Sequence, residues 1–252
     1  MPDRIPHPRR TAPWWVFAFA LTLAGCELPR FGQPDPATTE GGHTLGLWQG
    51  MVITAAAVGA FVLGLIVYAA IRFRRRSDDI PSQKPYNIPF EIAYTVTPVV
   101  IVAVLFAFSV VTQGNVDHTV ERPDLTVNVT GFQWGWQFEY PDQHVTITGS
   151  GSAGEMPTLV LPAGQVARLV LRTADVNHSF WVPAFLNKRD MIAGVDNQID
   201  VTPVDVGTFD GRCAEYCALD HWRMAFRLQV VPPDQLESAI AAAAAATGQG
   251  SR

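Results

Sequence analysis

GRCAEYCALDHWRM, residues 211–224, is the stretch of sequence that decides the fold of this chain. Two cysteines, a histidine and a methionine lie close together in it: Cys213, Cys217, His221 and Met224. Cysteine and methionine sulfur selects copper(I), zinc and iron–sulfur centres, and imidazole suits copper and zinc. The stretch therefore predicts a copper or zinc centre near the end of the chain.

A cupredoxin-like site takes its clustered ligands from a late loop and one further ligand from the end of a distant strand. His178 follows a β-rich run upstream of the cluster and is the natural candidate for that ligand. His144 lies in an alternating run that we expect to face solvent, and His43 and His118 lie near predicted membrane boundaries. The predicted ligand set is therefore His178 together with the late cluster.

Three kinds of site are compatible with these residues. A disulfide between Cys213 and Cys217 suits an oxidising compartment, but it leaves His221 and Met224 without a role. Tetrahedral zinc bound by both cysteines, His178 and His221 leaves Met224 unused. Copper uses every ligand, because a thioether is a reasonable weak axial ligand for copper and a poor ligand for zinc. The residues favour copper, and the other two sites stay open at this point.

The N-terminal segment has the pattern of an export signal. Three arginines precede a short apolar run, residues 14–23, which is too short to span a membrane comfortably. Residues 23–26, LAGC, look like the lipobox of bacterial lipoproteins, so residues 1–25 are predicted to be a cleaved signal peptide and Cys26 a lipidated N-terminus. The alternative is a plain signal peptide with Cys26 as an unmodified thiol. Residues 26–44, rich in proline, glycine and threonine, are predicted to be a linker.

Two apolar runs predict a transmembrane hairpin. Residues 45–73 and 89–113 are long enough, at about 1.5 Å per residue, to cross about 30 Å of hydrocarbon. The loop between them, residues 74–88, carries three arginines and Lys84, and Arg72 stands just before it. The positive-inside rule puts this loop in the cytoplasm. The chain after the hairpin is therefore expected on the outer side of a bacterial plasma membrane.

Glu91 lies at the start of the second apolar run, two residues after Pro89. A carboxylate at the first turn of a helix is favoured by the positive end of the helix dipole, which gives Glu91 a structural role. The alternative is a carboxylate that handles protons near the membrane boundary.

Residues 119–232 have the texture of an all-β domain. Short β-rich runs separated by turn residues predict a cupredoxin-like barrel or sandwich, with strands at 125–129, 133–140, 144–148, 158–161, 166–173 and 223–231. The alanine-rich end, residues 233–252, predicts a short C-terminal helix capped by Asp234 and a tail. The expected fold is thus a two-helix transmembrane hairpin, then a cupredoxin-like domain, then a short helix.

Charge is distributed unevenly along the chain. Residues 1–116 carry 9 lysines and arginines against 7 aspartates and glutamates, whereas residues 117–252 carry 9 against 16. An acidic outer domain argues against nucleic acid as a ligand and favours a cationic protein partner. The electrostatic field of the domain would act mainly on the rate of encounter with that partner.

Glu215 stands between the two cysteines in CAEYC, residues 213–217. With the histidines and methionine above, this segment resembles the dinuclear copper A motif of subunit II of the haem–copper cytochrome c oxidases. The resemblance covers most of the chain, because signal peptide, hairpin and cupredoxin domain follow in the family's order. It implies that the two cysteines bridge two coppers, with one copper on each of His178 and His221. Met224 and the Glu215 carbonyl would be weak ligands, and the Glu215 side chain would point to a magnesium or manganese site shared with subunit I.

Two further segments resemble the same family. Residues 131–140, GFQWGWQFEY, are similar to its aromatic stretch, which implies that electrons from cytochrome c enter at Trp134. Without the resemblance, this is an ordinary strand of core and interface aromatics. Residues 86–91, YNIPFE, resemble the family segment with a glutamate at the mouth of a proton path, which favours the proton-handling role of Glu91.

The resemblance implies a subunit that accepts electrons from cytochrome c and passes them to haem in subunit I. The reduction of dioxygen to water and proton pumping then belong to the partner chains, and subunits I and III and membrane lipid are the expected partners. A quinol oxidase subunit would share the architecture but lack the metal ligands. A membrane-anchored copper carrier would need neither the aromatic stretch nor Glu91.

Two positions depart from the family pattern. Ala193-Gly194-Val195 stands where the family often has Pro-Gly-Arg, which puts the ionic role of that arginine toward subunit I in question. Trp222 and Arg223 stand between His221 and Met224, where smaller or apolar residues are usual. Neither departure removes a copper ligand.

Overall fold

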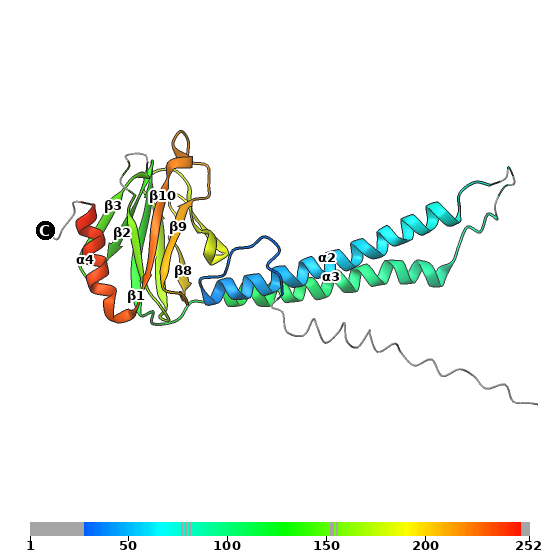
Figure 1. Ribbon diagram of the computed structural model, residues 1–252, viewed down its shortest axis with the longest axis horizontal. Coiled ribbons are helices and arrows are strands. Elements are labelled where there is room, and N and C mark those ends of the chain that lie inside the picture. Colours follow the sequence, from blue (N-terminus) through cyan, green and yellow to red (C-terminus); the bar gives the residue numbers. More distant parts are fainter. Residues whose placement is uncertain are drawn as a thin grey trace, which may run out of the picture.

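The computed structural model describes residues 28–76, 78, 80, 82–151, 154 and 156–247. In this part of the chain, two long helices lead into two five-stranded sheets and a short C-terminal helix (Figure 1). The predicted architecture of a hairpin, a cupredoxin-like domain and a C-terminal helix is confirmed. The predicted signal peptide, residues 1–25, and Cys26 lie outside the described residues.

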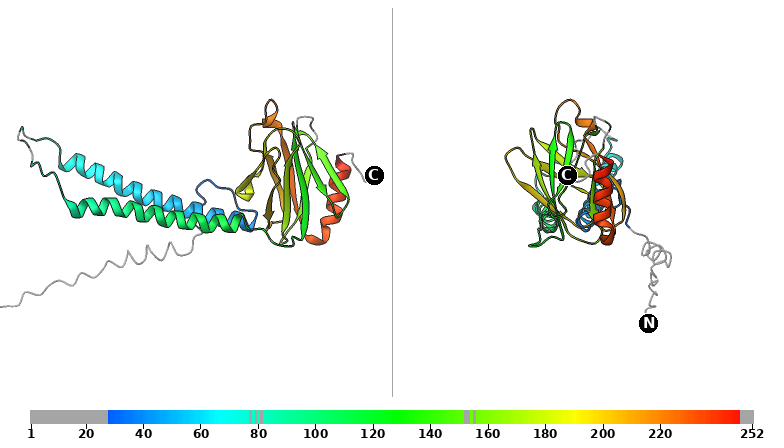
Figure 2. Two further views of the ribbon diagram at one scale, coloured as in Figure 1. Left: turned by 180° about the vertical axis from the view of Figure 1, so that it is seen from behind. Right: turned by 90° about the vertical axis from the view of Figure 1, so that its left-hand side faces the viewer.

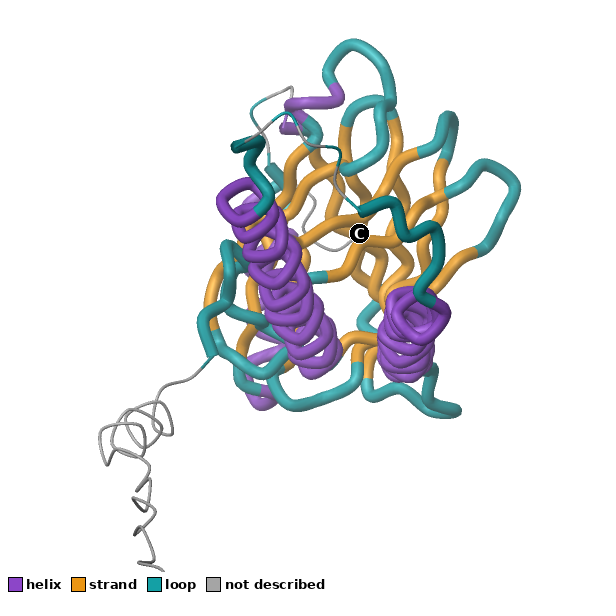
Figure 3. The backbone as a smooth tube through the Cα atoms, turned by 90° about the vertical axis from the view of Figure 1, so that its right-hand side faces the viewer, coloured by secondary structure: helices purple, strands orange, loops and turns teal. Residues whose placement is uncertain are grey.

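The hairpin consists of α2, Thr39–Arg72, and α3, Ile88–Val116. Both helices are long and apolar enough to cross a membrane, and Gly41 is the single buried residue described in either. Such exposed apolar helices satisfy all their backbone groups internally, as lipid requires. The helices diverge toward the predicted cytoplasmic loop (Figure 1), and Figure 3 looks along them toward the β domain.

The helices extend beyond their predicted spans. α2 begins at Thr39, within the predicted linker, because the Thr38 side chain accepts the N–H of Gly41 at 3.0 Å and caps the helix there. α3 continues to Val116, past the predicted end at residue 113. Thr38 therefore acts as a capping residue inside a segment whose composition suggested an irregular linker.

The β domain is a sandwich of two sheets, with strand orders β3-β2-β1-β5-β8 and β4-β10-β9-β6-β7. The β1–β5 and β4–β10 pairs are parallel, and the other pairs are antiparallel. The strands are β1 Leu125–Phe132, β2 Gly135–Tyr140, β3 Val145–Gly149, β4 Thr158–Pro162, β5 Ala167–Thr173, β6 His178–Val182, β7 Asn187–Met191, β8 Asn197–Val201, β9 Gly207–Cys213 and β10 Ala225–Val231.

The six predicted strands correspond to β1 to β5 and β10, and β6 to β9 were not predicted. β7 has the sequence NKRDM and buries only Met191, because it lies at a sheet edge. β9 buries only Gly211 and Cys213. A strand whose inward residues are glycine and cysteine has no hydrophobic period to detect.

Aromatic side chains fill the core beneath the metal-ligand loop. Trp136 and Phe138 from one sheet meet Phe180 and Phe226 from the other, with ring centroids 5.0 to 6.1 Å apart. A Cβ on Gly211 would lie 2.1 Å from the Phe226 ring, so a glycine is required to admit that ring. The core is therefore closely packed directly below the loop that carries the cysteines.

The C-terminal helix, α4, Leu236–Ala246, packs against β3 and β4 on one side of the sandwich (Figure 2). It buries Ile240, Ala243 and Ala244. The prediction that Asp234 caps this helix is wrong. Asp234 lies in a preceding 3₁₀ turn, Pro233–Gln235, and the N-cap residue, Gln235, makes no side-chain capping bond.

The β domain is tied to the outer end of the hairpin by hydrogen bonds. The Glu40 carboxylate accepts the Thr202 N–H and hydroxyl, both at 3.0 Å. A Cβ on Gly41 would lie 2.7 Å from the carbonyl oxygen of Phe185, which shows how closely α2 approaches the domain. After α3, Asp200 accepts the N–H of Val120 at 2.8 Å and pairs with Arg168 at 2.7 Å.

Candidate metal centre

Strand register brings the first two predicted ligands together. Cys213 ends β9 and His178 begins β6, and these antiparallel strands place Phe180 opposite Cys213. The main chain fixes the turn that follows, since the N–H of Ala214 donates to the Ser179 carbonyl at 3.0 Å and the N–H of Cys213 donates to the Met224 carbonyl at 2.9 Å. Residues far apart in the sequence therefore meet at one end of the sandwich.

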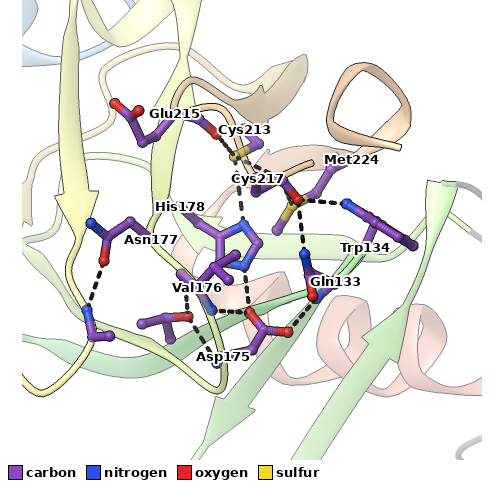
Figure 4. A network of polar contacts seen from close by, with 12 residues as sticks. Gln133, Trp134, Asp175, Val176, Asn177, His178, Cys213, Glu215, Cys217 and Met224 are labelled. Carbon is purple, nitrogen blue, oxygen red and sulfur yellow. Dashed lines mark hydrogen bonds and ion pairs between the residues drawn. The ribbon is translucent and has the colours of Figure 1, made fainter. Parts of the chain in front are cut away.

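The predicted ligands fall into two groups, each centred on one sulfur. Figure 4 shows both sulfurs with His178, Glu215 and Met224. In the first, Cys213 Sγ lies 3.8 Å from His178 Nδ1 and 3.2 Å from the carbonyl oxygen of Glu215. In the second, Cys217 Sγ lies 3.6 Å from His221 Nδ1 and 3.8 Å from Met224 Sδ. The two sulfurs are 3.9 Å apart and join the groups.

Both cysteines of the site are free thiols. Their 3.9 Å separation is far beyond the roughly 2.05 Å of a disulfide bond, so the disulfide alternative does not describe this structure. The ligand atoms of His178, Cys213 and Cys217 all lie within 4.8 Å of one another. His221 lies outside that group, although it reaches Cys217.

Most of the site is buried, and its electrostatics favour the thiolate form of one cysteine, Cys213. His178 and Met224 are fully buried, and Cys213 and Cys217 are 5% and 2% exposed. Burial alone raises the pKa of the Cys213 thiol, but hydrogen bonds from His178 and nearby backbone groups outweigh it and lower the pKa to about 7. Burial and the neighbouring Cys213 charge raise the pKa of Cys217. A cation would therefore be needed to stabilise both thiolates together.

His178 is oriented by groups that the sequence did not reveal. Its Nε2 lies 2.9 Å from Asp175 Oδ1, which leaves Nδ1 facing Cys213. Asp175 also accepts the N–H of Gln133 at 2.8 Å. A Cβ on Gly131 would lie 3.2 Å from the imidazole, so this glycine makes room for the ring. Metal-ligating histidines usually donate their other ring N–H to a carboxylate in this way. A search for a carboxylate close to His178 in the sequence could therefore have found Asp175, three residues before it.

Three side chains from β2 and the turn before it, those of Gln133, Trp134 and Trp136, also donate hydrogen bonds to the metal-ligand loop. The indole N–H of Trp134 donates to the Cys217 carbonyl at 2.8 Å, and the Gln133 amide donates to the same oxygen at 3.1 Å. The buried Trp136 donates to the Met224 carbonyl at 3.3 Å. Trp134, partly exposed, thus links the surface to the main chain of a candidate ligand.

The remaining predicted residues lie apart from the cluster. The Glu215 side chain is exposed and points away from the sulfurs (Figure 4). Glu91 lies in the first turn of α3, and its carboxylate accepts the N–H of Asn87 at 3.1 Å. Val195 is exposed, and Trp222 is 74% exposed with the Arg223 guanidinium 4.6 Å from its ring centre.

Family models match two parts of the chain. The transmembrane domain of cytochrome c oxidase subunit II matches residues 30–111, and the periplasmic domain of the same subunit matches residues 154–231. The probable cytochrome c oxidase subunit 2 of Streptomyces avermitilis is 40% identical to this chain, over 93% of the chain and 88% of that protein. The chain belongs to the cytochrome c oxidase subunit II family.

Other subunit II proteins extend the comparison. The cytochrome c oxidase subunit 2 of Mycobacterium bovis is 32% identical over 88% of this chain and 78% of that protein. The periplasmic domain of subunit II of the Bradyrhizobium japonicum oxidase is 31% identical and covers 51% of this chain and 99% of its own, with a TM-score of 0.46. As a subunit II, the chain is a membrane protein of an oxidase complex, with an external cupredoxin-like domain whose histidine and two cysteines can bind copper.

Proposed function

We propose that this subunit II holds a dinuclear copper centre, receives electrons from cytochrome c there and supplies them to the haem of subunit I. The observation that carries the proposal is the division of the ligands into two groups around a pair of free sulfurs 3.9 Å apart. Each group pairs one sulfur with one imidazole nitrogen and one weaker donor. This division suits two metal ions that share both thiolates.

The donor set fits copper better than zinc. Cys213 and Cys217 would bridge, His178 and the Glu215 carbonyl would complete one copper, and His221 and Met224 would complete the other. Structural zinc takes four nitrogen, sulfur or oxygen ligands at about 2.0–2.3 Å, and a thioether is a poor fifth partner. Two thiolate-bridged coppers would supply a one-electron carrier.

The chain's own residues bury most of such a centre and fix its ligands. The ligands sit on a packed aromatic core, and Asp175 holds His178 by the ring nitrogen that faces away from the sulfur. Rigid surroundings limit the change in geometry on electron transfer. The loop that carries Cys213, Cys217, His221 and Met224 is tied back by hydrogen bonds to Cys217 and Met224 carbonyls.

Trp134 is our candidate for the point at which electrons arrive. Its indole is partly exposed and its N–H donates to the carbonyl of Cys217 at 2.8 Å, so one hydrogen bond joins the surface to a bridging ligand's main chain. The acidic charge of residues 117–252 favours a cationic donor protein.

Further parts of the proposal follow from position. The hairpin lies in a bacterial plasma membrane, with the arginine-rich loop inside and the copper domain outside. Subunits I and III are the partners, and the outward Glu215 carboxylate contributes to a magnesium or manganese site shared with subunit I. Glu91 stands at the mouth of a proton path, residues 1–25 are a signal peptide, and Cys26 is lipidated.

Replacing Trp134 tests the route of electrons. Trp134→Phe removes the indole N–H but keeps an aromatic ring, so we expect slower reduction by cytochrome c in stopped-flow measurements on the intact oxidase, with an unchanged copper spectrum. Trp222→Phe, an exposed tryptophan without a bond to Cys217, serves as the matched control. A Trp134→Phe enzyme reduced at the wild-type rate would remove this role from Trp134.

A further inference from the structure

Residues 149–151, at the end of β3 and directly after it, lie against two parts of the candidate metal centre. One part is the turn that carries Trp134, and the other is the 3₁₀ turn His221–Arg223. The first residue of the 3₁₀ turn and Met224, which follows it, are the two candidate ligands grouped with Cys217. Residues 149–151 therefore adjoin both the candidate point of electron entry and one half of the ligand set.

Ser150 and its neighbour Gly149 fix this segment to the turn before β2. The Ser150 hydroxyl donates a hydrogen bond to the Trp134 carbonyl. Gly149 stands opposite Trp136 in the antiparallel pairing of β2 and β3, and a Cβ on Gly135 would lie 2.5 Å from the Gly149 carbonyl oxygen. The two backbones are thus as close as only a glycine permits, so the segment has no room to shift toward β2.

Gly151 brings the other side of the segment against the 3₁₀ turn. A Cβ on Gly151 would lie 2.2 Å from the Arg223 carbonyl oxygen and 3.4 Å from the main-chain nitrogen of Ala225. These two atoms belong to the residues on either side of Met224. Gly151 does not have a left-handed φ, unlike Gly154, so the need for glycine here is one of space. Any side chain at this position would force the segment and the 3₁₀ turn apart.

The 3₁₀ turn holds its two candidate ligands in a fixed relation to each other. The Met224 N–H donates to the His221 carbonyl at 3.2 Å. His221 Nδ1 lies 3.6 Å from the Cys217 sulfur, and Met224 Sδ lies 3.8 Å from it. Because one short turn carries both donors, a shift of the Arg223 carbonyl would move both of them relative to Cys217.

The ligand group centred on Cys213 depends on other contacts. Cys213 is the last residue of β9, which pairs with β6, and His178 is the first residue of β6. Asp175 holds the His178 ring from the side away from the sulfur. A displacement of the 3₁₀ turn should therefore change the Cys217 group more than the Cys213 group.

We propose that Gly151 is a positioning residue, which sets the distances of His221 and Met224 from Cys217 through its contact with the Arg223 carbonyl. This inference rests on the proposed dinuclear copper centre. Two coppers bound there would share one electron equally only while their surroundings match. With a side chain at residue 151, the 3₁₀ turn lies farther out, its two donors recede from one copper, and the electron is shared unequally.

Electron paramagnetic resonance of the copper-loaded full-length chain tests the proposal in Gly151→Ala. We expect unequal hyperfine coupling to the two copper nuclei. We also expect a loss of about 10-fold or more in affinity for one copper, which is usual when a group that supports a ligand is changed. Gly207→Ala is the matched control, because it adds the same methyl group to β9, where it would meet only the Phe209 ring at 3.7 Å. That variant should keep the wild-type spectrum.

Ser150→Ala is a milder variant that adds no atoms. It removes the hydroxyl that binds the Trp134 carbonyl and so loosens the same segment. We expect a smaller inequality of the hyperfine couplings than in Gly151→Ala. If Gly151→Ala yields no folded chain, this variant decides the outcome, and a wild-type spectrum in Ser150→Ala would then overturn the proposal.

Thermal unfolding of the metal-free chains separates positioning from folding. A purely structural role for Gly151 would lower the unfolding midpoint but leave equal couplings in the chain that is folded. Equal couplings in folded, copper-loaded Gly151→Ala would therefore overturn the positioning role while the dinuclear centre stands. A wild-type chain without a shared electron would instead overturn the dinuclear centre, and this inference with it.

Discussion

His178 is held through both of its ring nitrogens, and that arrangement decides which one can meet a metal. Asp175 occupies Nε2 at 2.9 Å, so Nδ1 faces Cys213 at 3.8 Å. Burial would raise the pKa of Asp175, but hydrogen bonds from His178 and from two main-chain N–H groups outweigh it and lower that pKa. An ionised Asp175 therefore orients the imidazole and increases its basicity as a ligand.

Removing the Asp175 carboxylate is expected to weaken copper binding. We expect Asp175→Ala to lower copper affinity about 10–100-fold, the usual effect of losing a carboxylate behind a ligating histidine. Asp175→Asn keeps an acceptor and should lose less. Competition with a copper chelator measures the affinity, and Asp196→Asn, a surface carboxylate paired with Arg172, is the control. Wild-type affinity in Asp175→Ala would contradict the positioning role.

Single residues also show what a sequence can and cannot reveal. Cys213, Cys217, His221 and Met224 could be proposed from the sequence because such ligands rarely cluster by chance in so short a stretch. Gly131 and Gln133 were not, because their importance lies in the space left for the His178 ring and in a bond to the Cys217 carbonyl. Such roles depend on register between strands, which residue type alone does not encode.

At the scale of elements, the first turn of α3 has two readings that a substitution can separate. Asn87 caps the helix by accepting the N–H of Phe90 at 3.4 Å, and Glu91 returns a bond to the N–H of Asn87 at 3.1 Å. This reciprocal arrangement resembles a capping box and explains a carboxylate there without any proton chemistry. The sequence suggested both roles, and the observed bond strengthens the structural one.

Glu91→Gln separates proton transfer from capping. A glutamine oxygen still accepts the Asn87 N–H, so the helix start should remain intact while the ionisable group is lost. If Glu91 lies on a proton path, we expect slower oxygen consumption with normal reduction by cytochrome c. Glu91→Ala should additionally lower the free energy of unfolding by about 1 kcal/mol. Wild-type turnover in Glu91→Gln would leave Glu91 with the capping role alone.

Helices and strands also differ in how readily they can be predicted from their sequences. β1 alternates buried and partly exposed residues along its whole length, so its period was visible. β7 and β9 were not predicted because neither has a hydrophobic period. β7 lies at a sheet edge and buries only Met191, and β9 buries only a glycine and a cysteine. The start of α2 was hidden because Thr38 caps a helix inside a glycine-rich segment.

At the scale of the whole molecule, the hairpin and the β domain form a closely fitted junction. Glu40 binds Thr202, and main-chain bonds join Ala37 to Ala184 at 2.7 Å and to Val204 at 2.9 Å. The order of hairpin and sandwich was predictable from hydropathy and texture. Their fit was not, since it depends on contacts between residues more than a hundred positions apart.

The junction can be tested with two adjacent glycines. A Cβ on Gly41 would lie 2.7 Å from a main-chain oxygen, so we expect Gly41→Ala to destabilise the full-length chain by about 1–3 kcal/mol. Gly42→Ala meets nothing and should be neutral or gain up to about 1 kcal/mol from helix propensity. Thermal unfolding in detergent, followed by tryptophan fluorescence, compares them. Equal midpoints for the two variants would contradict a close junction.

The most direct test of the central claim is electron paramagnetic resonance of the copper-loaded full-length chain, purified without its partner subunits so that haem signals are absent. The account predicts one unpaired electron shared equally by two copper nuclei, with copper bound at two ions per chain. A spectrum from a single copper nucleus, or a chain that takes up zinc or no metal in place of copper, would contradict it.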